Sequence, residues 1–392
     1  MMEKNQPVNR MLDFAPFYVM QLLQRAQQLE SEGRSVIHME VGEPDFPTPD
    51  PIIKAGQDYL SQGHVKYTPA SGLMRLREKI AEYYQTTYQV SVPCDRILIT
   101  PGASGALLLA LSVALETERS LMMADPCYPC NKNFVKFLGA GVQSIPVTEQ
   151  TRFQLTAELI AQHWQAQTQG VLLASPSNPT GTMVTDKELA AMIKTTERLG
   201  GRFFSDEIYH GLVYDMAQTS ALQISDQSFV INSFSKYFSM TGWRIGWLIV
   251  PEGYQEWADR LAQTLFISTP THSQYAALAA FKPETRNELE KRRQMFQARR
   301  DYLYDSLLNL GFSIPCKPEG AFYIYADCQR FTDNSYQFAL DLLEQEGVAV
   351  TPGLDFGNNA PDRYIRLAYT SSIDKMAIAI EKLGNFLCKY NK

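Results

Sequence analysis

The sequence predicts an α/β protein with a mostly parallel sheet flanked by helices in a large domain, followed by a smaller α/β domain. Between residues 97 and 250, short apolar runs alternate with helical or loop segments, as is typical of a parallel sheet covered on both faces. After Ser268 the pattern changes to a long charged helix and then a second series of short strands and helices.

The expected strands of the large domain each end in a segment with polar side chains. They cover residues 97–100, 121–124, 171–174, 202–205, 229–232 and 245–250. Ligands of such sheets bind outside the carboxyl ends of the strands. The residues that follow five of these strands are therefore expected to meet at one place: Gly102 to Ser104, Tyr128, Asn178, Asp206 and Lys236.

The remaining elements are expected at both ends of the chain. Apolar residues spaced by three and four predict a first helix from about Pro16 to Gly33, and a strand over residues 36–41 precedes a turn at 42–47. Beyond the sheet, we expect helices at 284–310, 335–346 and 374–389 and strands at 312–314, 321–326, 348–350 and 364–368.

Composition excludes several classes of protein. The chain has 392 residues, of which 45% are hydrophobic, and a net charge of -6 without lysine or arginine runs, so it is a poor candidate for nucleic-acid binding. No apolar stretch is long enough for a bilayer, and residues 1–10 contain no apolar signal segment, which predicts an unanchored, cytoplasmic protein.

The cysteines predict neither a disulfide framework nor a metal site. Six cysteines are too few to cross-link a chain of this length. Cys127 and Cys130 have the C-x-x-C spacing of a zinc or redox site, but the sequence holds no second such pair and no suitable histidine pair. We therefore expect reduced thiols and no bound metal.

Lys236 is the residue whose position is hardest to explain by packing. It follows a buried strand and stands in the segment Ser233-Phe234-Ser235-Lys236. A lysine seldom leaves water without a partner, so this side chain either extends to the surface or is held for chemistry.

The motifs around Lys236 occur in a characteristic order. Along the chain they are Asn178-Pro179-Thr180-Gly181, Asp206-Glu207-Ile208-Tyr209, Ser233-Phe234-Ser235-Lys236 and Arg244. Together they resemble the class I/II pyridoxal-phosphate-dependent aminotransferases of the aspartate aminotransferase superfamily, over a region from Phe14 to about Tyr369. The resemblance implies fold type I, with a large cofactor-binding domain at 46–280, a small domain at 281–392, and residues 1–45 joining the small domain.

By this resemblance, the cofactor is pyridoxal 5'-phosphate and the catalytic residues are Lys236, Asp206 and Tyr209. Lys236 would form an imine with the cofactor and carry the proton between the substrate and the cofactor. Asp206 would pair with the ring nitrogen, although an aspartate here could also cap a following helix. Tyr209 and Asn178 would bond the phenolic oxygen, although an Asn-Pro-Thr-Gly segment is also ordinary turn chemistry.

The resemblance also assigns the ring face and the phosphate. Tyr128 would stack on the ring, with a core or surface tyrosine as the alternative. Backbone amides at Ala103 and Ser104, at the start of a helix, would hold the phosphate dianion. The hydroxyls of Ser233 and Ser235, the Arg244 guanidinium, and Tyr67 from a neighbouring subunit would complete this site, which implies a homodimer with active sites at its interface.

The substrate contacts implied are Gly42, Asn178 and Arg366. Arg366 would bind the α-carboxylate through two parallel hydrogen bonds, with an arginine on a strand's solvent face as the alternative. Gly42 lies in a loop that passes close to the substrate in the family, where the glycine leaves room.

The expected activity is transfer of an amino group between an L-amino acid and a 2-oxo acid by a ping-pong mechanism. A carbon-sulfur β-lyase, a decarboxylase and a non-catalytic regulator are the alternatives; about a dozen residues precede Phe14, too few for a regulator's DNA-binding domain. Some relatives bind a second carboxylate through a lysine where this chain has Ala103 or Ser104. This, with the apolar segment 14–18, favours neutral or aromatic amino acids without excluding aspartate.

Overall fold

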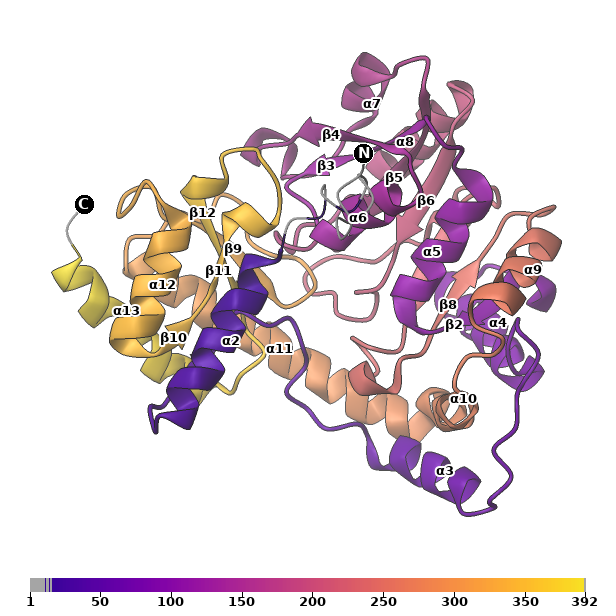
Figure 1. Ribbon diagram of the computed structural model, residues 1–392, viewed down its shortest axis with the longest axis horizontal. Helices are drawn as coiled ribbons and strands as arrows, with labels where there is room; N and C mark the ends of the chain where they lie inside the picture. Colours follow the sequence, from indigo (N-terminus) through magenta and orange to yellow (C-terminus); the bar gives the residue numbers. More distant parts are fainter. Residues whose placement is uncertain (1–10, 12–13, 15, 391–392) are drawn as a thin grey trace, which may run out of the picture.

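The computed structural model describes residues 11, 14 and 16–390. Two predictions concern residues outside this range. The absence of a signal segment was predicted from residues 1–10, and the apolar N-terminal segment includes Ala15; these residues lie outside the described residues. Figure 1 shows a large sheet with its helices on one side of the molecule and a group of shorter strands and helices on the other. The long helix α11 (Pro283–Asn309) runs between these two parts.

The large part is built on a seven-stranded sheet of order β2-β8-β7-β6-β5-β3-β4. Its strands are β2 (Ile97–Thr100), β3 (Ser120–Asp125), β4 (Gly141–Pro146), β5 (Thr168–Ala174), β6 (Arg202–Asp206), β7 (Phe229–Ser233) and β8 (Gly246–Ile249). Neighbours from β4 to β7 are parallel, and β8 is antiparallel to both β7 and β2. The predicted mostly parallel sheet is confirmed, and β4 is an edge strand that the sequence did not predict.

Both faces of the sheet are buried because successive side chains of each strand point to opposite sides. Phe203 belongs to one apolar cluster and Phe204 to the other, and Val171 and Leu172 divide in the same way. The helices of the large part are α3 (Asp50–Leu60), α4 (Met74–Tyr88), α5 (Gly102–Ala114), α6 (Pro129–Phe137), α7 (Ala157–His163), α8 (Asp186–Arg198), α9 (Gln255–Leu265) and α10 (Thr271–Ala277).

The smaller part contains two short sheets. One has the order β11-β12-β9, and the other pairs β1 with β10 in parallel. The elements are β1 (Ile37–His38), β9 (Tyr323–Asp327), β10 (Val348–Ala349), β11 (Thr351–Pro352), β12 (Tyr364–Ala368), α2 (Tyr18–Ser31), α12 (Ser335–Glu346) and α13 (Ile373–Lys389).

Two strand predictions in this part were wrong in extent. Residues 312–314 form only an isolated bridge between Ser313 and Asp327, because Pro315 follows and cannot donate a ladder hydrogen bond. The strand expected at 36–41 pairs with β10 only at Ile37 and His38. Beyond it, the Met39 carbonyl accepts a hydrogen bond from the Ala368 amide at 2.7 Å, so the chain leaves β10 for the end of β12.

The N-terminal helix α2 packs against the C-terminal elements. It contacts α12, β10 and β11. The amides of Tyr18 and Val19, at its start, donate to the Asp355 carboxylate at 2.7 and 2.8 Å, which satisfies amides that have no partner within the helix. These contacts agree with a small domain that includes the N-terminal segment, while the boundaries at 45 and 280 stay a prediction.

Candidate active site

A cavity of about 470 Å³ lies at the carboxyl ends of the parallel strands, between the sheet and the smaller part. It is lined by most of the residues that the sequence indicated: Gly42, Ala103, Ser104, Tyr128, Asn178, Asp206, Tyr209, Ser235, Lys236, Arg244 and Arg366. Arg244 reaches this edge although it precedes a strand, because β8 is antiparallel and therefore starts where its neighbours end. The expectation that separate strand ends meet at one site agrees with this lining.

Two of the predicted residues lie outside the lining. The Ser233 hydroxyl lies 2.9 Å from the Ser235 hydroxyl and 3.1 Å from the Ile245 carbonyl, so it holds the loop behind Ser235. The side chain of Tyr67 is 81% exposed on this chain. Neither residue therefore lines the cavity.

Lys236 extends into the cavity from the loop after β7. Its Nζ atom donates to the Gly42 carbonyl at 2.6 Å. Burial lowers the pKa of Lys236 to about 8, and the charges of Arg366 and Arg244 act in the same direction, while Glu43 and Asp206 oppose them. A lysine that is partly neutral near physiological pH is suited to nucleophilic attack on a carbonyl.

This pKa predicts how the cofactor-free protein reacts with cyanate, which modifies only neutral amines. Because the neutral fraction of Lys236 rises with pH through about 8, its rate of carbamylation should reach half its maximum there. For the lysine of an unstructured model peptide treated in parallel, the midpoint should lie at about 10.4. Peptide mapping at a series of pH values measures both rates, and equal midpoints would contradict the proposed environment of Lys236.

Asp206 is the last residue of β6 and is buried. Its Oδ1 atom accepts a hydrogen bond from the Ile208 amide at 3.2 Å. Burial raises the pKa of Asp206 to about 6, against the Ile208 N–H and the Lys236 charge, which lower it. A turn, not a helix, follows Asp206, so the helix-cap alternative is excluded.

Arg366 is buried in β12, with 5% of its surface exposed, which excludes the alternative of a solvent-facing arginine. Nη1 donates to Asn178 Oδ1 at 2.9 Å, and Nη2 donates to the Glu40 carbonyl and to Thr351 Oγ1 at 3.2 Å. Nε is buried without a hydrogen-bond partner. The guanidinium therefore has a fixed plane and an unsatisfied donor at the cavity wall.

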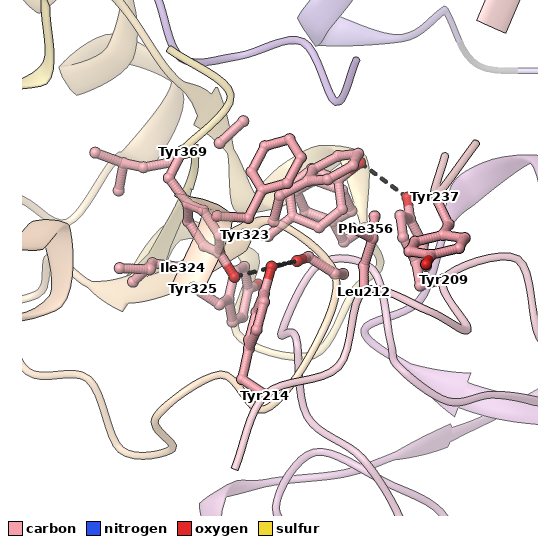
Figure 2. Packing of buried hydrophobic residues seen from close by; sticks show 14 of the residues in the cluster. Tyr209, Leu212, Tyr214, Tyr237, Tyr323, Ile324, Tyr325, Phe356 and Tyr369 are labelled. Carbon is pink, nitrogen blue, oxygen red and sulfur yellow. Dashed lines mark hydrogen bonds between the residues drawn. The ribbon is translucent and has the colours of Figure 1, made fainter. Parts of the chain in front are cut away.

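The sequence did not indicate the aromatic surroundings of this arginine. The Arg366 Cζ atom lies 4.4 Å from the ring centroid of Tyr323 and 4.9 Å from that of Phe356. Tyr323 also places its hydroxyl 2.9 Å from the hydroxyl of Tyr209. Figure 2 shows Tyr209, Tyr323 and Phe356 close together in the buried cluster.

The side chain of Tyr323 is the reason that position 42 must be a glycine. A Cβ atom at position 42 would lie 1.8 Å from the Tyr323 hydroxyl, an impossible overlap. The Gly42 carbonyl also accepts the Lys236 hydrogen bond. The expected contact of Gly42 with substrate stays a prediction, but the Tyr323 side chain fills the space beside the Gly42 Cα atom.

The start of α5 forms the opposite end of the cavity. No side chain caps this helix, and its first turn contains no acidic residue, so the amides of Ala103 and Ser104 are free to bind an anion. A Cβ atom at Gly102 would lie 2.7 Å from Arg244 Nη2, which shows how closely the guanidinium approaches the helix. This end of the cavity suits a phosphate group.

All six cysteines are free thiols. Cys127 is buried, with its pKa raised to about 11 by burial, and neither it nor Cys130 forms a disulfide. Within the described part of the chain, no three or more His, Cys, Asp or Glu side chains are grouped to hold a metal ion. None of the described helices combines the length and apolar character needed to cross a membrane.

A lysine, an aspartate and an arginine, each partly or fully buried, thus converge on one cavity at the carboxyl edge of a mostly parallel sheet. This fold and site define an α/β enzyme of fold type I. Residues 34–383 match the model of the family "Aminotransferase class I and II", and the chain belongs to that family. The protein is a transaminase.

Relatives and solved structures of similar length support this assignment. The chain is 38% identical to the (5-formylfuran-3-yl)methyl phosphate transaminase of Methanocaldococcus jannaschii, over 97% of this chain and 99% of the relative. It is also 38% identical to the valine–pyruvate aminotransferase of Mycobacterium tuberculosis, over 95% and 96%. A crystal structure of an aminotransferase from Mycobacterium tuberculosis superimposes with a TM-score of 0.95 at 37% identity, covering 98% of this chain and 100% of that one.

Proposed function

We propose that this transaminase uses pyridoxal 5'-phosphate, held in the described cavity, to move the amino group of neutral or aromatic L-amino acids to 2-oxo acids. The observation that supports it most is the convergence of Lys236, Asp206 and Arg366 on a cavity whose far end is an uncapped helix N-terminus. When bound, the cofactor supplies an aldehyde that accepts the amino group and a ring that takes up an electron pair.

The residues of the chain have complementary tasks in this proposal. Lys236 would hold the cofactor and then move the proton from the substrate's Cα atom, which its lowered pKa favours. The Asp206 carboxylate would pair with the ring nitrogen and keep it protonated, while Tyr209 and Asn178 would donate hydrogen bonds to the phenolic oxygen. Tyr128 would cover the ring face.

The phosphate would bind at the start of α5. The amides of Ala103 and Ser104, the Ser235 hydroxyl and the Arg244 guanidinium line this end of the cavity. Ser233 supports this site indirectly, through its contact with Ser235. Arg366 and Asn178 would bind the substrate's α-carboxylate and so fix the Cα atom over Lys236.

The proposal includes a homodimer, because exposed Tyr67 would reach the phosphate of the neighbouring subunit. Lys236→Ala and Tyr67→Ala each remove a different part of a shared site. Mixing the two inactive homodimers under exchange conditions should restore about a quarter of the wild-type activity, since half of the dimers are mixed and each has one intact site. The recovered activity is measured as the rate constant of the mixture. If subunit exchange is proven and no activity returns, the site is not shared between subunits.

Charges along the cavity support a neutral substrate. Three cations line it, Lys236, Arg244 and Arg366, and each has a role in the proposal. The charged residues of the lining that remain are acidic: Asp355, and Glu40, whose carboxylate lies against His38. No further cation from the described residues lines the cavity to meet a second carboxylate.

One wall of the cavity is apolar. Helix α2 and the residue before it contribute Phe17, Val19, Met20 and Leu23. An aliphatic or aromatic substrate side chain would replace water along this wall. Valine, which appears in the name of one relative, is such a donor.

The test is the single-turnover reaction of the purified enzyme with one amino acid at a time, without any 2-oxo acid. Phenylalanine, leucine or valine should consume the absorption band of the bound cofactor about a hundredfold faster than aspartate, because a second carboxylate would be buried without a partner. Leu23→Lys should reduce this difference and the uncharged control Leu23→Met should not. A wild-type preference for aspartate would overturn the proposed substrate class.

A further inference from the structure

Tyr323 occupies a central position among the residues to which the proposed function gives roles. It lies at the start of β9 with 1% of its surface exposed, yet it lines the cavity. Its hydroxyl is 2.9 Å from that of Tyr209, and its ring is 4.4 Å from the Arg366 Cζ atom. A single side chain thus contacts both Tyr209, the proposed partner of the cofactor's phenolic oxygen, and Arg366, the proposed anchor of the substrate.

Strand register explains the contact with Arg366. In the antiparallel pair of β12 and β9, Arg366 lies opposite Tyr325, and Tyr323 lies opposite Ala368. Residues two positions apart on a strand share a face, so Tyr323 and Arg366 are diagonal neighbours on the same face of the sheet. The ring therefore meets the guanidinium, and the ring centroid of Phe356 lies 4.9 Å from the same Cζ atom.

The contact with Tyr209 concerns the direction of a proton. Two hydroxyls 2.9 Å apart share one hydrogen bond, in which either can donate. Burial raises the pKa of both phenols, so each keeps its proton at neutral pH. If Tyr323 donates to Tyr209, the proton of Tyr209 is free to point into the cavity.

The surroundings of the Tyr323 hydroxyl restrict it to this role. Gly42 closes one side so tightly that a Cβ atom there would overlap the oxygen. Among the described residues, Tyr209 is the hydrogen-bond partner found for this hydroxyl. The two rings meet edge to face, with centroids 5.8 Å apart and planes at 84°, so the hydroxyls approach while the rings stay packed.

We propose that Tyr323 is a positioning residue. Its hydroxyl sets the direction in which the Tyr209 hydroxyl proton points, and its ring fixes the plane of the Arg366 guanidinium. This rests on the proposed function, in which Tyr209 donates to the phenolic oxygen of the cofactor and Arg366 binds the substrate's carboxylate. The hydroxyl and the ring act on different steps, so two substitutions separate them. Tyr323→Phe removes only the hydroxyl, and Tyr323→Leu removes the ring as well.

The first measurement is a spectrophotometric pH titration of the cofactor band in purified holoenzyme. Without the hydrogen bond that Tyr323 donates, the Tyr209 O–H group is less polarised and donates more weakly to the phenolic oxygen of the cofactor. That oxygen then holds the proton that it shares with the imine nitrogen more strongly. The titration midpoint of Tyr323→Phe should therefore rise by on the order of half a unit to one unit. An unchanged midpoint would overturn the hydroxyl's role.

The second measurement is the dissociation constant of 3-phenylpropionate, a carboxylate without an amino group, from the same holoenzymes. Tyr323→Leu should weaken binding about tenfold, because the guanidinium loses the aromatic face that fixes its plane, while Tyr323→Phe should bind as the wild type does. Equal binding by all three proteins would overturn the ring's role. If Tyr323→Leu does not fold, a Tyr323→Met variant takes its place.

Tyr369→Phe is the matched control. It deletes the hydroxyl of a buried tyrosine in the same cluster (Figure 2). The Ala321 carbonyl, which accepts from that hydroxyl, keeps a donor in Tyr214. This control should change neither the midpoint nor the dissociation constant; changes equal to those of Tyr323→Phe would reduce Tyr323 to a packing residue. A wild-type protein that takes up no pyridoxal phosphate would overturn the proposed function itself, before any variant is compared.

Discussion

Replacement of Lys236 by alanine should abolish transamination, lowering kcat by on the order of a millionfold or more. The reason is that no second lysine of the described chain lines the cavity, so no other amine can hold the cofactor or move the proton of the substrate. Single-turnover absorption measurements with phenylalanine provide the rate. Borohydride reduction followed by peptide mapping should show the cofactor attached to Lys236 in the wild type and to no residue in the variant.

Lys236→Arg is the control that separates charge from nucleophilicity. It keeps a cation near Asp206 but removes the amine, since a guanidinium stays protonated in proteins. It should be as inactive as the alanine variant, while binding of the cofactor's phosphate end persists in both. Turnover by Lys236→Arg near the wild-type rate would show that position 236 contributes only charge.

The part of the site at the strand ends was predictable from the sequence because the topology forces it. Residues after parallel strands meet at one edge wherever the strands stand in the sheet, so Asn178, Asp206 and Lys236 could be grouped without knowing the strand order. The direction of β8 was not predictable in the same way. Its apolar run has no feature that distinguishes a parallel from an antiparallel neighbour, and the position of Arg244 depends on that direction.

Tyr323 and Glu40 were not predicted, because their positions depend on contacts between distant parts of the chain. Every residue of β9 is buried, so its sequence shows no alternation that would single out Tyr323. Its relation to Arg366 follows only from the register with β12. Glu40 enters the site through its carbonyl, which accepts from Arg366, and a backbone atom leaves no mark on residue type.

One strand was not predicted and another was predicted where only a bridge forms, for related reasons. β4 is an edge strand with mostly exposed or half-buried side chains, so residues 141–146 lack the continuous apolar run by which the inner strands were predicted. Residues 312–314 have side chains suited to a strand, and those of Phe312 and Ile314 are buried, but the segment forms no ladder of strand hydrogen bonds. Apolar character predicted burial in that segment, and hydrogen bonding decided the structure.

Replacement of Arg366 by leucine should lower kcat/KM for amino acids by about a thousandfold, because a buried carboxylate would lose its charged, bidentate partner. Arg366→Lys should give an intermediate loss, since an ammonium keeps the charge but cannot form the two parallel bonds. Arg366→Leu also leaves Asn178 Oδ1 without its donor, while the Glu40 carbonyl keeps the Thr351 hydroxyl, so the free energy of unfolding should fall and is measured alongside.

An amine without a carboxylate separates the two effects. Phenethylamine has the side chain and amino group of phenylalanine but nothing for Arg366 to bind, so its slow reaction with the enzyme-bound cofactor should be nearly the same in the wild type and in Arg366→Leu. The ratio of the two rate constants, phenylalanine over phenethylamine, then isolates the contribution of the carboxylate contact. An equal loss for both amines would mean that Arg366 acts through the packing of Asn178 and Tyr323, and not by binding the carboxylate.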